Sequence, residues 1–276
     1  MNAFDVHQAG CVAALLLHPA ATVLLVAGLH RGADAPVRWA IAIAVAGLIA
    51  HGLALGAEVH AIGGLPADLF SSLSLLSWVI VAVLLAGVAR YPFRELLPVA
   101  LPGAVAMIAL DLFAGPGARP LATGSAALDA HVIASLLAYG LLAIGALNAV
   151  FISAQHWLLR QHRRPGLLGV LPPLVSMENL LFRLIGTGWV LLTVSLVTGL
   201  LFVERLFAQH LAHKTLLSVV AWLVFGLLLA GRWKYGWRGM RVVRLCLIGM
   251  AILVLAYVGS KAVLELLLDR QWQAAG

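Results

Sequence analysis

The chain has 276 residues, of which 63% are hydrophobic and 11% are charged, and its mean hydropathy is +1.03. A soluble domain of this size needs more polar residues to cover its surface, so the composition excludes one. The formal net charge of +7 does not indicate nucleic-acid binding, because the basic residues lie in short loops between apolar runs, where they set topology. We therefore expect a polytopic membrane protein with no nucleic-acid partner.

Eight apolar runs are long enough to cross a bilayer, because a transmembrane helix needs about 20 apolar residues. They cover residues 9–29, 39–58, 69–89, 96–113, 129–154, 181–203, 214–233 and 243–267. No segment between them is long enough for a globular domain. The sequence thus predicts an all-α fold of eight transmembrane helices and a single integral-membrane domain over residues 1–276, surrounded by the lipid bilayer.

The longest connection, residues 155–180, is basic and then rich in proline. It leads into PPLVSMENLLFRLIG, where apolar side chains recur at three- and four-residue spacing. They are Met177, Leu180, Leu181 and Leu184. This pattern fits two structures equally, an interfacial amphipathic helix or the first turns of the sixth span.

Arginine and lysine predict the orientation, since cytoplasmic loops carry an excess of both. One set of alternate loops, which contains Arg31, Arg90, Arg160 and Arg238, holds most of these residues. The positive-inside rule then places those loops in the cytoplasm and both termini outside. Most acidic residues fall on the opposite side, so we expect a relatively anionic outer face.

The ten histidines fall at different predicted depths. His51 lies in GLIAHGLALGAEVH, about 10–12 Å below the outer end of the second span at ~1.5 Å per residue. An ionisable group at that depth is a functional candidate, and the alternative is a hydrogen bond to a neighbouring helix. Glu58 and His60 then mark the interfacial end of the span. His18 precedes Pro19, and we expect it to hydrogen-bond a carbonyl that the proline frees.

His131 opens the fifth span and shares the outer half of the membrane with His51. Neutral imidazole is the commonest side-chain ligand of haem iron, and two axial nitrogens lie about 4 Å apart, since each Fe–N bond is about 2 Å. We accordingly predict His51 and His131 as haem-iron ligands, with haem b as the cofactor. His213, which precedes the seventh span, is a weaker candidate ligand, and the favoured alternative for it and for His60 is an interfacial anchor.

Other chemistry is thin in this sequence. It contains no P-loop, no glycine-rich dinucleotide fingerprint and no H-E-x-x-H zinc motif. Ser71, Ser74 and Ser77 repeat every third residue, a weak sign of a polar stripe, but small polar residues in membranes mostly serve close helix packing. We assign no catalytic residue, and nothing here positively indicates an enzyme.

Several segments of the C-terminal half carry a family pattern and cover most of residues 131–268. They are HVIASLLAYGLLAIGALNAVF, PPLVSMENLLFRLIGTGWVLLTVSLVTGLLF, HKTLLSVVAWLVFGLLLAGRWKYGWRGMRVVR and LAYVGSKAVLELL. Their specific motifs are PPL-x-S-M-E, LLT-x-x-L-x-TG and GWRG-x-R. On these residues the chain resembles the cytochrome c assembly membrane proteins, the CcsA/CcmC/HemX superfamily, and most closely their YpjD inner-membrane branch. AHGLAL in the second span and SLSLL in the third also fit that branch.

The resemblance implies a multi-pass protein of the bacterial inner (cytoplasmic) membrane, related to haem handlers. In the cytochrome c synthases, membrane histidines hold haem in transit and a Trp-rich outer segment presents it for attachment. His51 and His131 match the membrane-histidine positions, and His213 lies where the synthase pattern enters its next span. The Trp-rich segment is missing, because the eight tryptophans are scattered. We therefore expect a haem-binding protein that retains haem or assists cytochrome biogenesis proteins, without covalent haem attachment.

Two other hypotheses stay open at this point. The lack of soluble domains and of synthase machinery fits a non-haem accessory or scaffold subunit of a transporter or another membrane complex. A membrane oxidoreductase that reacts with quinone would need a redox-active haem and a lipid-facing pocket.

Overall fold

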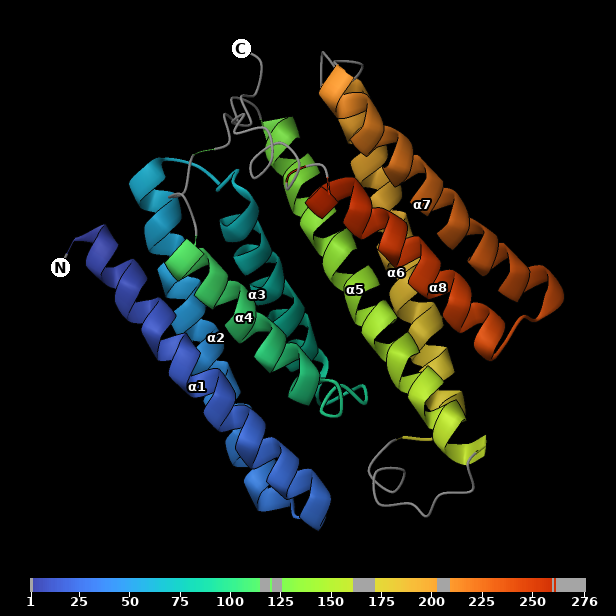
Figure 1. The fold of residues 1–276 in the computed structure, drawn as a ribbon, viewed down its shortest axis with the longest axis horizontal. Coiled ribbons are helices and arrows are strands. Elements are labelled where there is room, and N and C mark those ends of the chain that lie inside the picture. Colours follow the sequence, from blue (N-terminus) through green and yellow to red (C-terminus); the bar gives the residue numbers. More distant parts are fainter. Residues whose placement is uncertain are drawn as a thin grey trace. The chain divides into compact units, whose positions relative to one another are not determined.

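The computed structural model describes residues 2–114, 120, 126–160, 172–202, 209–259 and 261. Within these residues the chain is helical and contains no β-strand, which confirms the all-α prediction (Figure 1). The helices are α1 (Ala3–Arg31), α2 (Asp34–Ile62), α3 (Leu69–Gly87), α4 (Leu97–Ala114), α5 (Ala126–Arg160), α6 (Leu174–Phe202), α7 (Gln209–Tyr235) and α8 (Met240–Val254), followed by the π-helix η1 (Leu255–Gly259).

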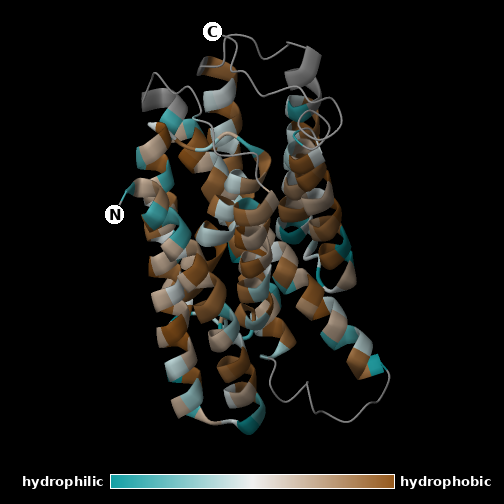
Figure 2. Ribbon diagram, turned by 60° about the vertical axis from the view of Figure 1, so that its left-hand side comes forward, coloured by the Kyte–Doolittle hydropathy of each residue, from teal (hydrophilic) through white to brown (hydrophobic). Residues whose placement is uncertain are grey.

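Eight helical segments of the described chain are long and apolar enough to cross a membrane, with α8 and η1 together making the eighth. This confirms the predicted number of spans. Figure 2 shows hydrophobic residues along most of the helical ribbon. Hydropathy placed the start of α1 too late, because Asn2 and Asp5 form a reciprocal capping box that begins the helix before its apolar part.

Helix α6 is continuous from Leu174, so the segment with the Met177 pattern is the first part of the sixth span. The patterned side chains Met177, Leu180, Leu181 and Leu184 are all buried within the protein. The apolar face therefore packs on other helices, which favours the second of the two predicted structures over an interfacial helix.

Helices α1 to α4 form one compact unit, unit 1. Both α1 and α3 pack against α2 and α4, so each helix has two neighbours within the unit. Small residues allow the close approach of α1 to α2. A Cβ added at Gly10 would lie 2.7 Å from the carbonyl oxygen of Ala50, and one at Gly28 would lie 2.9 Å from Val37.

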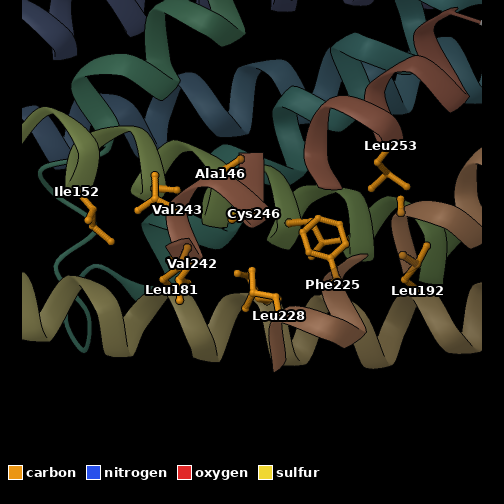
Figure 3. Close-up of a cluster of buried hydrophobic side chains, with 14 of the residues drawn as sticks. Ala146, Ile152, Leu181, Leu192, Phe225, Leu228, Val242, Val243, Cys246 and Leu253 are labelled. Carbon is orange, nitrogen blue, oxygen red and sulfur yellow. The ribbon is translucent and has the colours of Figure 1, made fainter. Parts of the chain in front are cut away.

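Helices α5 to α8 form a second compact unit, unit 2. Both α5 and α7 pack against α6 and α8. Its apolar core contains large side chains from every helix, part of which Figure 3 shows around Phe225, Leu228 and Cys246. Gly249 makes room for the Phe225 ring, which would lie 2.9 Å from a Cβ at that position. The single membrane domain expected from the sequence stays a prediction.

Candidate functional site

His51 is fully buried in α2 of unit 1. Its Nε2 lies 3.0 Å from Oγ of Ser74 on α3. Its Nδ1 has no hydrogen-bond partner among the described residues. The predicted alternative to a ligand role, a hydrogen bond to a neighbouring helix, is thus present, but it uses only one of the two ring nitrogens.

Small residues of α2 explain how His51 becomes buried. Trp78 of α3 lies over Gly52, where an added Cβ would be 2.9 Å from the indole nitrogen. The same nitrogen donates to the carbonyl of Leu48 at 3.0 Å. This hydrogen bond fixes α3 against α2 beside His51, so water is kept from the imidazole.

His18 of α1 is also fully buried, and neither of its ring nitrogens has a hydrogen-bond partner in the described chain. The predicted bond to a carbonyl freed by Pro19 is not formed, so that prediction was wrong. The ring instead packs against Gly47 of α2, where an added Cβ would lie 2.6 Å from Nδ1 of His18. Thr22 Oγ1 donates to the His18 carbonyl at 2.8 Å.

Polar side chains join three helices of unit 1 near the Glu58 end of α2. Ser71 Oγ on α3 lies 2.7 Å from Oδ1 of Asp111 on α4 and 3.4 Å from Oε1 of Glu58. Asp68 caps α3 by accepting from the backbone N–H of Ser71 at 2.9 Å. Sequence reasoning missed this cluster, and the three-residue serine repeat was the signal that could have found it.

His131, near the start of α5, is partly buried in unit 2. Its Nδ1 donates to the backbone carbonyl of Ser195 on α6 at 2.9 Å, and Thr198 Oγ1 lies 3.2 Å from the same nitrogen. A carbonyl only accepts, so Nδ1 carries the hydrogen and Nε2 of the neutral ring is unprotonated. Gly199 gives the ring its place, because an added Cβ would lie 3.0 Å from Cε1 of His131.

Two lysines approach one tyrosine ring in unit 2. The Nζ atoms of Lys214 and Lys261 lie 5.2 Å and 4.9 Å from the ring centroid of Tyr257, and Lys261 donates to the Tyr257 hydroxyl at 3.1 Å. Lys214 also acts electrostatically on His131. Tyr257 belongs to η1, and π-helical turns occur often at functional sites. No motif in the sequence marked these lysines.

The family motifs of the C-terminal half meet each other in the structure. Glu178 of PPL-x-S-M-E accepts from the backbone N–H of Gly239 in GWRG-x-R at 2.9 Å. Asn148 Nδ2 of α5 donates to the carbonyl of Met177 at 2.8 Å. These contacts join α5, α6 and the α7–α8 turn, so the motifs hold unit 2 together.

Of the predicted iron ligands, His51 belongs to unit 1 and His131 belongs to unit 2. His213 lies in α7, but its side chain is outside the described residues. In the described part of the chain, no group of three or more His, Cys, Asp or Glu side chains could hold a metal ion. Axial haem ligation requires fewer protein groups, since two imidazoles suffice.

The chain belongs to the cytochrome c assembly family, because the family described as "Cytochrome C assembly protein" matches residues 37–268. It is similar to the "Inner membrane protein YpjD" of Escherichia coli (strain K12), with 34% identity over 256 residues, which cover 92% of this chain and 97% of that protein. The resemblance read from the sequence motifs is therefore confirmed. With its eight membrane-spanning segments, the protein is a multi-pass protein of the bacterial inner membrane.

The chain is also similar to more distant relatives. The "Cytochrome c biogenesis protein CcsA" of Parasynechococcus marenigrum is 27% identical over 222 residues, 70% of this chain and 72% of that protein. The "Protein HemX" of Brevibacillus brevis is 28% identical over 173 residues, 60% of this chain and 63% of that protein. No solved structure matches the chain. The placement of both termini outside stays a prediction.

Proposed function

We propose that this protein binds haem b within the membrane and acts in cytochrome c biogenesis. The observation that carries the proposal is the state of two imidazoles. His51 and His131 each have one ring nitrogen held by a protein group, and the other nitrogen of His51, Nδ1, is buried without a hydrogen-bond partner in the described chain. Family membership supports the biogenesis role, since relatives carry that name.

His131 has the hydrogen bonding of a metal-ligating histidine. Such residues almost always donate their second ring N–H to a carbonyl, carboxylate or water, which fixes the tautomer and raises the basicity of the ligating nitrogen. The Ser195 carbonyl accepts from Nδ1, so Nε2 presents its lone pair. Ser195 is held in turn by Ser135, whose Oγ lies 2.7 Å from the Ser195 hydroxyl.

His51 of unit 1 is the other proposed ligand. If Ser74 accepts from Nε2–H, then Nδ1 is the unprotonated nitrogen of the neutral ring. A buried polar atom without a partner costs about 1–3 kcal/mol. Coordination of iron by Nδ1 would remove that cost, which favours metal binding at His51.

Lys214 and Lys261 are candidates to bind the carboxylates of the haem. A haem carries two carboxylates, and charge-assisted hydrogen bonds from ammonium groups to carboxylates are among the stronger polar contacts in proteins. Both lysines approach the Tyr257 ring of unit 2, which makes them candidates to bind the haem carboxylates.

Bound haem would supply an iron that gains and loses one electron, and the residues described above would bind it, orient it and keep water away. The scattered tryptophans offer no surface to present haem to an apocytochrome. The proposal is therefore retention of haem or an accessory role, rather than covalent attachment.

The test is the haem content and visible absorption of the full chain, purified in detergent from haem-replete cells. We expect a Soret band, and its loss in the His51→Ala, His131→Ala double variant. His30→Ala is the matched control, because His30 is an exposed histidine in the last turn of α1. A wild-type protein without haem, or a double variant with unchanged absorption, overturns the proposal and favours the non-haem accessory role.

A further inference from the structure

Two carboxyl groups from different helices share one serine hydroxyl in unit 1. Ser71 Oγ contacts Oδ1 of Asp111 at 2.7 Å and Oε1 of Glu58 at 3.4 Å. The second carboxyl oxygens, Glu58 Oε2 and Asp111 Oδ2, are buried and have no hydrogen-bond partner among the described residues. Within that part of the chain, neither carboxyl forms an ion pair.

The single hydroxyl hydrogen of Ser71 favours one protonated carboxyl among Glu58 and Asp111. Ser71 has a single hydroxyl hydrogen, so it can donate fully to only one of two carboxylates. Two ionised carboxylates would also repel each other strongly where the local dielectric is low. If one carboxyl is protonated, its O–H donates to Ser71 and Ser71 donates to the other carboxylate. Every contact then holds one hydrogen.

We propose that Glu58, Ser71 and Asp111 form a proton-binding site in the membrane region of unit 1, where two carboxyl groups hold one proton. The contact of 2.7 Å to Asp111 has the length of a hydroxyl donating to a carboxylate. The contact to Glu58 is longer, at 3.4 Å, and the proposal places the proton on this carboxyl.

The groups around the two carboxyls favour the binding of a proton. The other titratable groups that face it are Asp68, the cap of α3, and Cys11 and His7 of α1. His7 donates through Nδ1 to the Ala54 carbonyl at 3.2 Å. No lysine or arginine of the described residues forms an ion pair with either carboxyl. Protonation is the ordinary way for a buried carboxyl to lose an unfavourable charge.

The fully buried His51 lies on the same helix as Glu58 and contacts Ser74 of α3, the helix that carries Ser71. Ser74 Oγ lies 3.0 Å from Nε2 of this ring, and its Nδ1 has no hydrogen-bond partner in the described chain. Polar chains of carboxyl, hydroxyl and imidazole groups inside membranes mark proton relays. The trio stands without haem, whereas its connection to a ligating His51 rests on the proposed function.

The transfer itself needs no redox partner. The Glu58 O–H bond breaks as a new O–H bond forms on Ser71, and the original Ser71 hydrogen moves to Asp111. The negative charge passes from Asp111 to Glu58, and Ser71 ends with one hydrogen as it began.

Infrared difference spectroscopy of the full chain in detergent, between neutral and alkaline pH and without haem, tests the site. We expect a carbonyl band of a protonated carboxylic acid at neutral pH, which shifts in heavy water. Glu58→Gln and Asp111→Asn should each abolish it, because an amide N–H replaces the shared proton as donor. Asp34→Asn, which removes an exposed carboxyl from the same helix as Glu58, should leave the band unchanged.

A wild-type protein with no acid band at neutral pH overturns the proposal, and so does a band that survives in both amide variants. If the variants fail to fold, carbon-13 labelling of aspartate and glutamate assigns the band in the wild type and keeps the test decisive. Haem absorption is read separately, so loss of the acid band and loss of haem remain distinguishable.

Discussion

Ser74 Oγ on α3 lies 3.0 Å from Nε2 of the fully buried His51 on α2, and this contact leaves Nδ1 of His51 without a hydrogen-bond partner in the described chain. The hydroxyl orients the ring, and the free nitrogen gives the ring something left to bind. The haem proposal depends on that relationship.

Replacing Ser74 with alanine should weaken haem binding. Partners that orient a metal ligand typically contribute 10–100-fold to metal affinity, so we expect a loss of about 10-fold or more. The measurement is the haem dissociation constant of purified protein. Ser77→Ala is the control, because the Ser77 hydroxyl donates only to the backbone carbonyl of Ser74 at 2.8 Å. Equal haem affinity in the two variants would show that Ser74 does not orient His51 for haem binding.

Replacing Gly199 with alanine should disturb His131. The added Cβ would lie 3.0 Å from Cε1 of the ring, so the imidazole or α6 must shift and the bond to Ser195 must change. Gly186→Ala on the same helix adds a Cβ with nothing within 4 Å and serves as the matched control. We expect several-fold weaker haem binding in Gly199→Ala only; the same haem spectrum and affinity in both variants would contradict this role of His131.

Replacing Gly47 with alanine should destabilise unit 1. The added Cβ would lie 2.6 Å from Nδ1 of His18, and overpacking of this kind typically costs about 1–3 kcal/mol. Thermal unfolding in detergent measures the effect against Gly56→Ala, a position on α2 with nothing within 4 Å. Adding His18→Ala should restore part of the lost stability. If Gly47→Ala unfolds at the same temperature as Gly56→Ala, the packing of His18 against α2 is not as described.

Lys261→Gln should lower haem affinity and reduce its dependence on salt, because the variant loses an ammonium group that would attract the haem carboxylates. Lys234→Gln is the control, since Lys234 is an exposed residue in the last turn of α7. Titration of haem into the purified protein at low and high salt gives both quantities. A salt dependence that is unchanged in Lys261→Gln, relative to Lys234→Gln, would argue against this contact.

The sequence predicted the helices well, because the length of an apolar run reports directly on a membrane span. Its errors lie at helix ends, where hydrogen bonds rather than hydropathy decide. The capping box of Asn2 and Asp5 extends α1. Helix α6 begins at Leu174, inside the PPL-x-S-M-E motif and before the apolar run that hydropathy marks. The family itself was also readable, since its motifs are short and specific.

The polar contacts could not be predicted, because hydropathy fixes the position of a residue along a helix but not which neighbour it faces. Glu58, Ser71 and Asp111 come from three helices and looked like separate acids and packing serines. His18 was expected to bond its own helix, yet Gly47 of α2 offers it space. Such pairings depend on the rotation of each helix, which only the packed structure shows.

The central claim is the proposal that His51 and His131 are haem-iron ligands, and electron paramagnetic resonance of the oxidised protein tests it most directly. We expect the low-spin signal of iron with two imidazole ligands in the wild type. His131→Gly should give a high-spin signal, and added imidazole should restore the low-spin one; His51→Gly should behave in the same way. A low-spin signal that persists in either variant without imidazole would contradict the claim.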